Sequence, residues 1–471
     1  MSAKATVPNK KGTSKMETTS ARPVVVEPGG SGVVAHVGLH ALCSFADRLG
    51  LGHSLSSRIP AHSERFPLHD RGKVLVQQMA VLAGGGESCA DIEYLRSEET
   101  LFGFVPSDST VWRTFHEITP ETREGLKAAV AEVRAKVWSR SAATIGTDPV
   151  VLDVDASLVT IHTEAKQGTG PTYKGGYGFH PLLVFADQTG ECLSGMLRPG
   201  NAGANTVGDH IVVLDEALAQ LPGEIATGHH VGDDPSVASR DVVIRSDSAG
   251  CSEGFLGACR SRNVGFAVVA RRNTQVEAAI FDAIGLEELW APAIRQDGEL
   301  RDGAAVIELT SLVDLSNYPS GTRLIVRREP LHPGAQQSLF PAIDFRYWGH
   351  YTDQAGDPVA LDCFMRAHAH VEEHIARLKD SGLCRFPFSN LEANRNWLFC
   401  VTAAADLVRW FQLLCLDGEL ALARPKQLRW SLFHAPGRLV RSARREIVRI
   451  LEAWPSAEAL LSAYERIALL T

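Results

Sequence analysis

The spacing of hydrophobic residues changes near residue 146 and divides the chain into a helical part and a part with strands. Between 36 and 140, apolar residues recur every three or four positions, which is the spacing of a helix with one buried face. A Ser-Asp-Ser cap at 107–109 marks the start of one such helix. Helices are predicted over 39–49, 72–83, 88–97, 109–118 and 120–139.

Beyond residue 146, runs rich in β-branched residues predict three consecutive strands, then helix, strand, helix and strand. The strands are expected at 150–162, 179–187, 191–198, 241–246 and 265–271, and the helices at 207–220 and 252–262. The segment Asp187-Gln188-Thr189-Gly190 suits a hairpin turn between the second and third strands. This order is typical of a ribonuclease-H-like mixed sheet, which makes the fold class α/β.

The second half of the chain continues with strands and then with helices. Strand-like stretches at 304–312, 322–328 and 343–352 predict a β-rich insertion into the sheet domain. After residue 379 the pattern is helical to the C-terminus, with breaks at Pro387, Pro425, Pro436 and Pro455. The predicted architecture is therefore a mixed sheet with a β-rich insertion, plus N-terminal and C-terminal helical regions.

Two carboxylates stand out on the predicted strand VLDVDASLV. Side chains alternate between the faces of a strand, so Asp153 and Asp155 project together from one face. The opposite face is wholly apolar and consists of Val150, Leu152, Val154, Ala156 and Leu158. A buried carboxylate is costly unless a positive charge compensates it, and a divalent cation meets that need. A strand cap or a pairing with arginine explains either aspartate equally well.

A third acidic residue, Asp247, follows the apolar strand that ends at Arg245. Ligand sites in sheets with parallel strands lie at the carboxyl ends of those strands. The alternative is a structural role, because the Ser-Asp-Ser sequence here also suits the N-cap of a helix over 253–262. Asp247 alone does not distinguish the two.

The fourth acidic residue of interest, Glu372, lies in the helical stretch HAHVEEHIARLKDSGL. The apolar stripe of this helix consists of Phe364, Val371, Ile375 and Leu378. Glu372 is expected at the edge of the buried face, and Lys379, close to two turns later, on the same side. A carboxylate for metal beside a cation for phosphate is what phosphodiester chemistry requires, although any surface helix can carry such a pair.

Taken together, the acids follow the order Asp, Asp, Glu with spacings of 92 (155 to 247) and 125 (247 to 372) residues. With these motifs, the chain resembles a bacterial insertion-sequence transposase of the DDE superfamily, in the branch with the signature Tyr, two residues, Arg, three, Glu, six, Lys. The resemblance runs from about 36 to 450, with the most specific matches at LDVDASLV, YKGGYGFHPLLVFADQTGECLSGMLRPGNAGANTVGDHI, VVIRSDSAG, HVEEHIARLKDSGLCRFPFSNLEANRNWL and RLVRSARR. The sequence departs from the signature at Met365 and His368, which stand for the Tyr and the Arg.

The resemblance implies an enzyme that binds terminal inverted repeats and carries out DNA strand cleavage and strand transfer. Two Mg²⁺ or Mn²⁺ ions are expected on Asp155, Asp247 and Glu372, because hard carboxylate ligands select these metals. The implied partners are double-stranded DNA, as element ends and as target, and a second copy of the chain in a synaptic homodimer. His368, Arg377 and Lys379 are the expected DNA contacts of the Glu372 helix.

The net charge of −8 argues mildly against a DNA-binding protein, so the distribution of the charges matters. Basic residues cluster late in the chain, and with the interleaved aromatic rings they suit a phosphate backbone and an exposed base. The expected DNA contacts are Arg438, Arg441, Arg444 and Arg445, with Trp430, Phe433 and His434 among them. The second-rank candidates are Arg271, Arg272, Arg323, Arg327 and Arg328. The alternative is a solvated basic helix face.

The predicted domains follow these patterns. They are a disordered tail (1–35), a helical DNA-binding or dimerisation region (36–145), the first part of the catalytic core (146–275), the β-rich insertion (276–355), the core segment with the Glu helix (356–400) and a helical basic C-terminal region (401–471). The N-terminal helices suit a helix-turn-helix or, equally, a plain bundle. The resemblance implies that the insertion carries Arg and aromatic residues over the cut DNA end, but Trp348 and Tyr351 are expected in the core.

The location expected for this protein is cytoplasmic, in a bacterium and associated with the nucleoid. Nine scattered cysteines without a Cys-x-x-Cys pair suit reduced thiols. No secretory signal is evident, and no apolar run approaches the roughly 18 residues of a membrane helix. No membrane association is expected.

Two alternative functions remain. His370, Glu373 and His374 formally match the His-x-x-Glu-His pattern of inverted zinc proteases, with the histidines one turn apart and the glutamate as base. That hypothesis leaves Asp155 and Asp247 without a role. The other alternative is a non-catalytic, domesticated DNA-binding relic that keeps the fold.

Overall fold

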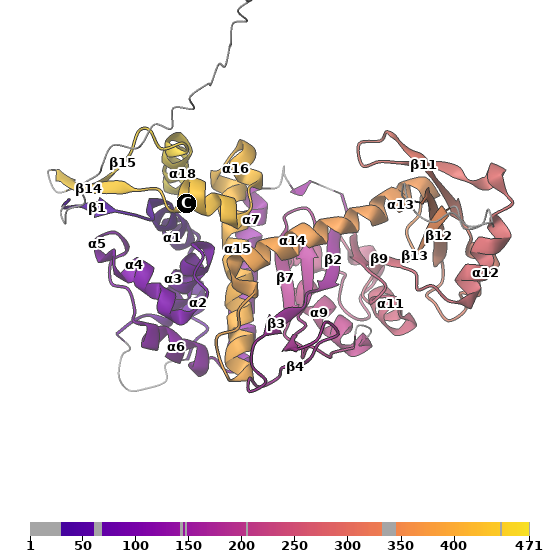
Figure 1. Cartoon of the computed structure of the whole chain (residues 1–471), viewed down its shortest axis with the longest axis horizontal. Coiled ribbons are helices and arrows are strands. Elements are labelled where there is room, and N and C mark those ends of the chain that lie inside the picture. The colour runs from indigo at the N-terminus through magenta and orange to yellow at the C-terminus, as the bar shows by residue number, and fades with distance from the viewer. Residues whose placement is uncertain are drawn as a thin grey trace, which may run out of the picture.

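The computed structural model describes residues 30–60, 68–141, 145–146, 148–203, 206–331, 345–442 and 445–470. The predicted disordered tail lies outside the described residues up to position 29. The molecule is elongated. Helices from both halves of the chain gather at one end, a mixed sheet lies in the middle, and the predicted insertion forms the other end (Figure 1).

The N-terminal region is helical, as predicted. A short strand, β1 (Val33–Val34), precedes α1 (Val37–Leu49), α2 (Leu51–Ser56), α3 (Arg71–Ala83), a 3-10 turn (Cys89–Ile92), α4 (Glu93–Arg96), α5 (Glu99–Phe102), α6 (Asp108–Glu117) and α7 (Pro120–Arg140). Local chemistry fixes several helix starts. The Asp70 carboxylate accepts a hydrogen bond from the Lys73 N–H ahead of α3, and the Thr119 hydroxyl accepts one from the Thr122 N–H ahead of α7.

The central sheet has nine strands among the described residues, in the order β10-β11-β12-β13-β9-β8-β2-β6-β7. The strands that precede the insertion are β2 (Val150–Ala156), β6 (Leu182–Ala186), β7 (Glu191–Met196), β8 (Val242–Ser246) and β9 (Val264–Val269). β2 pairs antiparallel with β6 and parallel with β8, and β8 pairs parallel with β9. Three antiparallel strands followed by two parallel ones confirm the predicted ribonuclease-H-like mixed sheet.

The elements around these strands differ slightly from the prediction. The predicted strand 150–162 breaks after Ala156, and the next stretch forms a separate small sheet of β3 (Val159–Ile161), β4 (Gly170–Pro171) and β5 (Tyr177–Phe179). The turn at 187–190 joins β6 to β7, as predicted. The helices of this part are α9 (Val207–Ala219), α10 (Gly223–Ala226), a 3-10 turn (Pro235–Val237) and α11 (Glu253–Arg260).

The predicted β-rich insertion continues the same sheet. After α12 (Thr274–Ala283) and a 3-10 turn (Glu287–Leu289), it forms β10 (Ala291–Ile294), β11 (Leu300–Glu308), a second 3-10 turn (Thr310–Leu312), β12 (Arg323–Pro330) and β13 (Phe345–Thr352). The last of these strands pairs antiparallel with β9, with Tyr351 opposite Val268. The insertion is therefore held rigidly to the edge of the core by backbone hydrogen bonds.

The two faces of the sheet are covered by different layers, as the alternation of apolar residues on β6 shows. Leu182 and Val184 pack with Leu152 of β2 in the core under α9 and α11. Leu183 and Phe185 point the other way, into the larger core that also contains the N-terminal helices. The sheet is thus sandwiched between helices on both sides, as expected for a sheet with central parallel strands.

The second half of the chain ends in helices and a hairpin. The elements are α13 (Pro358–Arg366), a 3-10 turn (Ala367–Ala369), α14 (His370–Leu378), a π-helical turn (Lys379–Leu383), α15 (Leu391–Cys415), α16 (Gly418–Leu422), α17 (Pro425–Leu428), a second π turn (Arg429–Phe433), β14 (Gly437–Ser442), β15 (Arg445–Ile450) and α18 (Ala457–Leu469). The prediction of helix throughout was wrong for 437–442 and 445–450. Pro436 and Gly437 end the helical run, and the β-branched Val440, Ile447 and Val448 favour strands.

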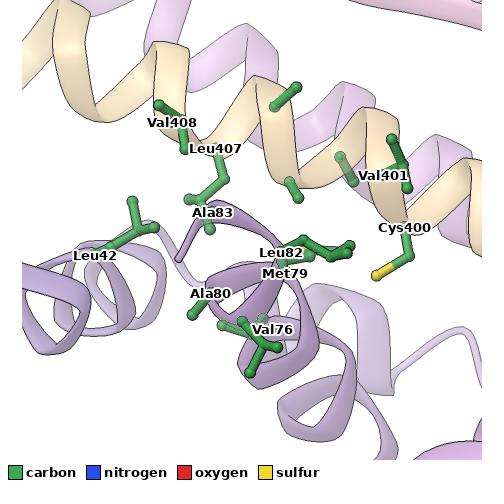
Figure 2. Close-up of a cluster of buried hydrophobic side chains, with 14 of the residues drawn as sticks. Leu42, Val76, Met79, Ala80, Leu82, Ala83, Cys400, Val401, Leu407 and Val408 are labelled. Carbon is green, nitrogen blue, oxygen red and sulfur yellow. The ribbon is translucent and has the colours of Figure 1, made fainter. Parts of the chain in front are cut away.

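The longest helix, α15, packs between the N-terminal helices and the sheet. Figure 2 shows Leu42 of α1 with Met79 and Leu82 of α3 facing Val401 and Leu407 of α15. All five side chains are fully or almost fully buried. This contact joins the two ends of the chain into one hydrophobic core, so the N-terminal region is anchored to the rest of the molecule.

α15 is also an exception to the predicted absence of membrane-length apolar runs. Its most apolar window of 18 residues has a mean hydropathy of 1.5, long and apolar enough to cross a membrane by composition alone. However, 78% of that window is buried inside the protein. The apolar surface of α15 is therefore accounted for by the core.

A buried ion cluster ties α15 to α7 and to the edge strand of the sheet. Arg134 Nε donates to Glu191 Oε1 at 2.8 Å, and Arg134 Nη2 donates to Asp406 Oδ2 at 2.6 Å. The indole N–H groups of Trp138 and Trp410 donate to the same glutamate, each at 2.6 Å. Buried charges are tolerated when they are paired and hydrogen-bonded in this way. The cluster therefore anchors β7 to α7 and α15.

Candidate active site

The parallel pairing of β2 and β8 brings two of the expected catalytic acids together. Asp153 is paired with Arg245 and Val154 with Ser246. Continuing this register by one residue sets Asp155 beside Asp247, and adjacent strands lie about 4.8 Å apart. Both residues lie at the carboxyl ends of their strands, where ligand sites in such sheets form.

The Asp155 carboxyl group lies in surroundings that oppose its charge. The pKa of Asp155 is raised from 3.8 to about 6, mainly by burial and to a smaller extent by the charges of Asp247 and Glu372. A hydrogen bond from the Ala156 N–H and the imidazole of His368 act in the opposite direction.

Asp247 lies at the surface immediately after β8. Its Oδ1 accepts a hydrogen bond from the Ala249 N–H at 2.8 Å, which fixes the tight turn that follows. The structural alternative for this residue is not the one observed, because the N-cap of α11 is Ser252, whose hydroxyl accepts from the Phe255 N–H. Asp247 is therefore available at the end of the strand.

Glu372 comes to the site from a helix. α13 and α14 run in line across the sheet, so that the start of α14 lies over β2 (Figure 1). Val371, Ile375 and Leu378 are buried as predicted, and Glu372 is exposed beside them. The glutamate is thus held at the edge of the sheet face from which Asp155 projects.

These three acids suit a divalent cation, although the side chains stand apart. Among the described residues, no three His, Cys, Asp or Glu side chains are close enough to hold an ion as they are placed. The case for a metal is the unbalanced charge: Asp155 is largely desolvated beside two carboxylates, and no ion pair with a described residue offsets it. Carboxylate oxygens are the ligands that Mg²⁺ and Mn²⁺ prefer.

A second set of charges lies beneath these acids, centred on Arg245. Its Nε and Nη2 donate to the two oxygens of Asp153 at 2.8 and 2.7 Å. Nη2 also lies 2.8 Å from Asp187 Oδ2, in the turn between β6 and β7. Nη1 donates to the Phe364 carbonyl at 3.0 Å, which ties the strand to α13. The arginine alternative raised by the sequence thus holds for Asp153 and not for Asp155.

His368 joins this inner set of charges. Its Nδ1 lies 2.8 Å from Asp153 Oδ1, and its side chain is only 12% exposed. The expected hydrogen bond from His368 to DNA is therefore replaced at Nδ1 by one to the protein. In the place of the signature Arg, this residue fastens the start of the Glu372 helix to β2.

Arg377 and Lys379 have opposite positions. The Arg377 guanidinium is buried, donates to Gln412 Oε1 and the Leu422 carbonyl, and has its pKa lowered to about 10 by burial and by Arg409. The expectation that Arg377 contacts DNA is therefore corrected, because α15 and α16 cover it. Lys379 is exposed at the end of α14.

The His-x-x-Glu-His residues do not form a zinc site. His370 Nδ1 lies 3.0 Å and His374 Nε2 3.7 Å from Asp187 Oδ1, and the other oxygen of this carboxylate is held by Arg245. Glu373 points elsewhere, toward Arg377 at 3.9 Å and Arg424 at 3.8 Å. The histidines hold α14 to the turn after β6, and the glutamate is not placed to act as their base.

A cavity of about 780 Å³ lies next to Asp247, where β9 meets β13. Its lining includes Ser248, Arg271, Arg272, Arg346, Tyr347 and Trp348. Arg271 Nε donates to the Ser248 carbonyl at 3.1 Å, and its Nη2 is buried without a hydrogen-bond partner in the described residues. The cavity therefore combines cationic and aromatic groups at the end of the strand that carries Asp247.

The aromatic residues of the insertion divide between core and surface. Tyr351 is buried, as expected, whereas Trp348 is 39% exposed and was wrongly expected in the core. The Arg327 guanidinium lies 5.1 Å from the centre of the Trp348 ring. All three second-rank arginines of the insertion strands are neutralised. The pairs are Arg323 with Glu308, Arg327 with Asp362 and Glu329, and Arg328 with Glu287.

The basic C-terminal residues lie mainly on the hairpin β14–β15. Arg438, Arg441 and Arg445 are exposed there, and Arg444 lies outside the described residues. Of the interleaved aromatic residues, Trp430 is 77% exposed and Phe433 is buried. His434 bonds to the Gly84 carbonyl at 3.0 Å, which leaves Trp430 as the accessible ring of this group.

The chain matches a known protein family over almost its whole length. The family model described as transposase DDE domain group 1 matches residues 16–471. No curated protein matches the chain. A solved structure, the cryo-EM structure of a piggyBac transposase synaptic complex with hairpin DNA, is similar at 11% identity and a TM-score of 0.40, over 84% of this chain and 80% of that chain. A TM-score this low carries no argument about function, so the family model carries the assignment.

Proposed function

Because this chain belongs to the family of DDE transposase domains, group 1, we propose that it cuts DNA at the ends of an insertion sequence and joins those ends to target DNA. The observation that supports the chemistry is the pairing of β2 with β8, which sets Asp155 and Asp247 at neighbouring strand ends, together with the contact between β2 and α14, the helix that carries Glu372. Proteins of this family use divalent metal ions. We propose two Mg²⁺ or Mn²⁺ ions at these carboxylates.

Asp155, Asp247 and Glu372 would hold such ions, which would supply activation of the attacking water or 3′-hydroxyl group and charge neutralisation at the leaving oxygen. The protein holds Asp155 and Asp247 on neighbouring strands whose positions the backbone hydrogen bonds fix. Glu372 is held by α14, which Asp153 and Asp187 fasten to the sheet through His368 and His370. This rigidity favours catalysis, because the ligands need little reorganisation during the reaction.

The DNA end is proposed to enter beside Asp247. The cavity there presents Arg271, Arg272 and Arg346 for phosphate oxygens and Trp348 for an exposed base. Lys379 is exposed on the Glu372 helix and is proposed as a further phosphate contact. The proposed assembly is a homodimer that holds two element ends.

The test is excision of a marked cassette flanked by the DNA that borders this gene. We expect wild-type protein to excise it and Asp247→Asn to fail. Asp241→Asn is the matched control, because Asp241 is an exposed acid at the opposite end of the same strand. Equal excision by Asp247→Asn would contradict the proposed site. Binding of the ends without excision by the wild type would instead favour the non-catalytic relic.

A further inference from the structure

The hairpin β14–β15 has two chemically different faces, as its register shows. Directly paired residues of antiparallel strands lie on the same face. Arg438 pairs with Arg449, Val440 with Ile447, and Ser442 with Arg445, so these six share one face, here called the outer face. Leu439 with Val448 and Arg441 with Glu446 occupy the other, inner face.

The inner face anchors the hairpin to the protein. Leu439, Val448 and Ile450 are half-buried against the main hydrophobic core. β1 extends the hairpin to a three-stranded sheet, and Val34, on the inner side opposite Gly437, is 3% exposed. Near the hairpin tip, Arg441 Nε and Nη2 each lie 3.0 Å from Glu446 Oε1, so the charge on this face is balanced. The hairpin is therefore a fixed part of the surface.

The outer face carries positive charge that nothing in the described structure balances. Arg438, Arg445 and Arg449 are exposed, and none of them has an ion-pair partner among the described residues. Arg438 and Arg449 stand directly opposite each other, an arrangement of like charges that destabilises a strand pair. No acidic residue of either strand lies on this face. The folded state thus retains a repulsion that an anion would remove.

We propose that the outer face of β14–β15 is a docking surface for double-stranded DNA, with Arg438, Arg445 and Arg449 on its phosphates. This inference rests on the proposed function and deepens it, because it assigns the DNA contact to one face of the hairpin, adds Arg449 and removes Arg441. Charge complementarity selects the occupant. A two-stranded ribbon fits the major groove of duplex DNA. Each arginine can donate two parallel hydrogen bonds to one phosphate group.

The location of the hairpin bears on which DNA it contacts. It lies beside the N-terminal helices, at the end of the molecule opposite the insertion strands (Figure 1). DNA docked there is bound away from the catalytic acids. The hairpin therefore contributes to holding DNA and not to the chemical step.

The test measures how the affinity of the full-length protein for a linear duplex of the bordering DNA depends on salt. Each phosphate contact contributes about 0.9 to the slope of log affinity against log salt concentration. We expect the slope to become shallower by about 0.9 in Arg449→Gln. In the triple variant Arg438→Gln, Arg445→Gln, Arg449→Gln it should become shallower by about 2.7. Arg441→Gln is the matched control: it removes the same charge from the same hairpin and should leave the slope unchanged. Thermal denaturation of each variant checks that it is folded.

Two results would overturn the inference: an unchanged slope in the triple variant, or an equal loss in Arg441→Gln and Arg449→Gln. In either case excision by the wild type would leave the proposed function standing. Failure of wild-type protein to bind any duplex would count against the proposed function itself. A loss of binding to a single-stranded RNA probe but not to duplex DNA would assign the face to another partner and would also overturn the inference.

Discussion

Asp153 and Asp155 lie on the same face of the same strand, two residues apart, yet their surroundings are opposite. Asp153 receives two hydrogen bonds from Arg245 and a third contact from His368. Asp155 receives one backbone hydrogen bond and faces two further carboxylates. The charge of Asp153 is thus neutralised by the protein, whereas that of Asp155 is left for a ligand.

Charge balance, and not burial alone, separates the structural Asp153 from Asp155, the proposed metal ligand. A paired buried carboxylate holds two elements together, and its partner is already in the fold. An unpaired one beside like charges raises the free energy of the folded state until a cation binds. The unbalanced acids are the ones at the carboxyl ends of β2 and β8.

The largest expected effect is on catalysis. Glu372→Gln should lower cleavage of a DNA end by at least about 10³-fold, because a metal-assisted step loses several kcal/mol of transition-state stabilisation. The adjacent Glu373→Gln should retain nearly full activity, since Glu373 makes only long ion pairs at the surface. Single-turnover cleavage measures both. Equal loss in the two variants would contradict the assignment.

The second largest effect is expected on stability, when Arg245 is removed. Arg245→Met should lower the free energy of unfolding by about 3–5 kcal/mol, because Asp153 would stay fully buried without its positive partner and the half-buried Asp187 would lose an ion pair. Urea denaturation followed by circular dichroism measures the change. Arg96→Met is the control, since Arg96 pairs with Glu93 at the exposed surface and its loss should change the free energy of unfolding little. Similar losses of stability in the two variants would show that the ion pairs of Arg245 contribute no more than a surface pair does.

A smaller effect is expected from the pH dependence of stability that Asp155 causes. The pKa of Asp155 is raised from 3.8 to about 6, so the folded state binds a proton more tightly than the unfolded state. Stability therefore falls as pH rises from about 4 to 6 and is lowest above 6. Without divalent ions at pH 8, Asp155→Asn should be more stable than wild type by at most about 3 kcal/mol.

That difference between Asp155→Asn and wild type should shrink as the pH falls toward 4, where wild-type Asp155 is protonated in the folded state and nearly half protonated in the unfolded state. Thermal or urea unfolding across this range, in a chelating buffer, provides the curve. A variant less stable than wild type at pH 8 would show that the carboxylate is already compensated within the protein.

The smallest expected effect concerns His368. His368→Asn should lower the free energy of unfolding by about 1 kcal/mol, because it weakens one hydrogen bond to a buried carboxylate. Affinity for DNA should be unchanged, since the imidazole Nδ1 faces Asp153. A reduced salt slope of DNA binding in this variant would restore His368 as a phosphate contact.

The fold could be predicted from local pattern wherever one face of an element is apolar. The alternation in VLDVDASLV placed both aspartates on one face, and the stripe of Val371, Ile375 and Leu378 positioned Glu372 on its helix. The choice between Asp153 and Asp155 could not be made locally. It depends on Arg245, which lies 92 residues from Asp153 in the chain and meets it only through strand pairing.

The remaining errors have the same physical origin. Arg377 was expected at the surface, but α15 and α16, distant in sequence, cover it. The segments 437–442 and 445–450 were expected to be helical, but Pro436 ends the helical run and the β-branched Val440, Ile447 and Val448 favour strands. Trp348 was expected in the core because aromatic residues in strands are usually buried. Its exposure follows from its place at the cavity beside Asp247.

The most direct test of the central claim is Mn²⁺ binding by the protein with its bordering DNA, followed by electron paramagnetic resonance. Wild-type protein should bind Mn²⁺, and Asp155→Asn and Asp247→Asn should each lose that binding while remaining folded. Asp241→Asn should bind as wild type does. Unchanged Mn²⁺ binding in both Asp155→Asn and Asp247→Asn would contradict the account, because the unbalanced carboxylates would then have no metal to hold.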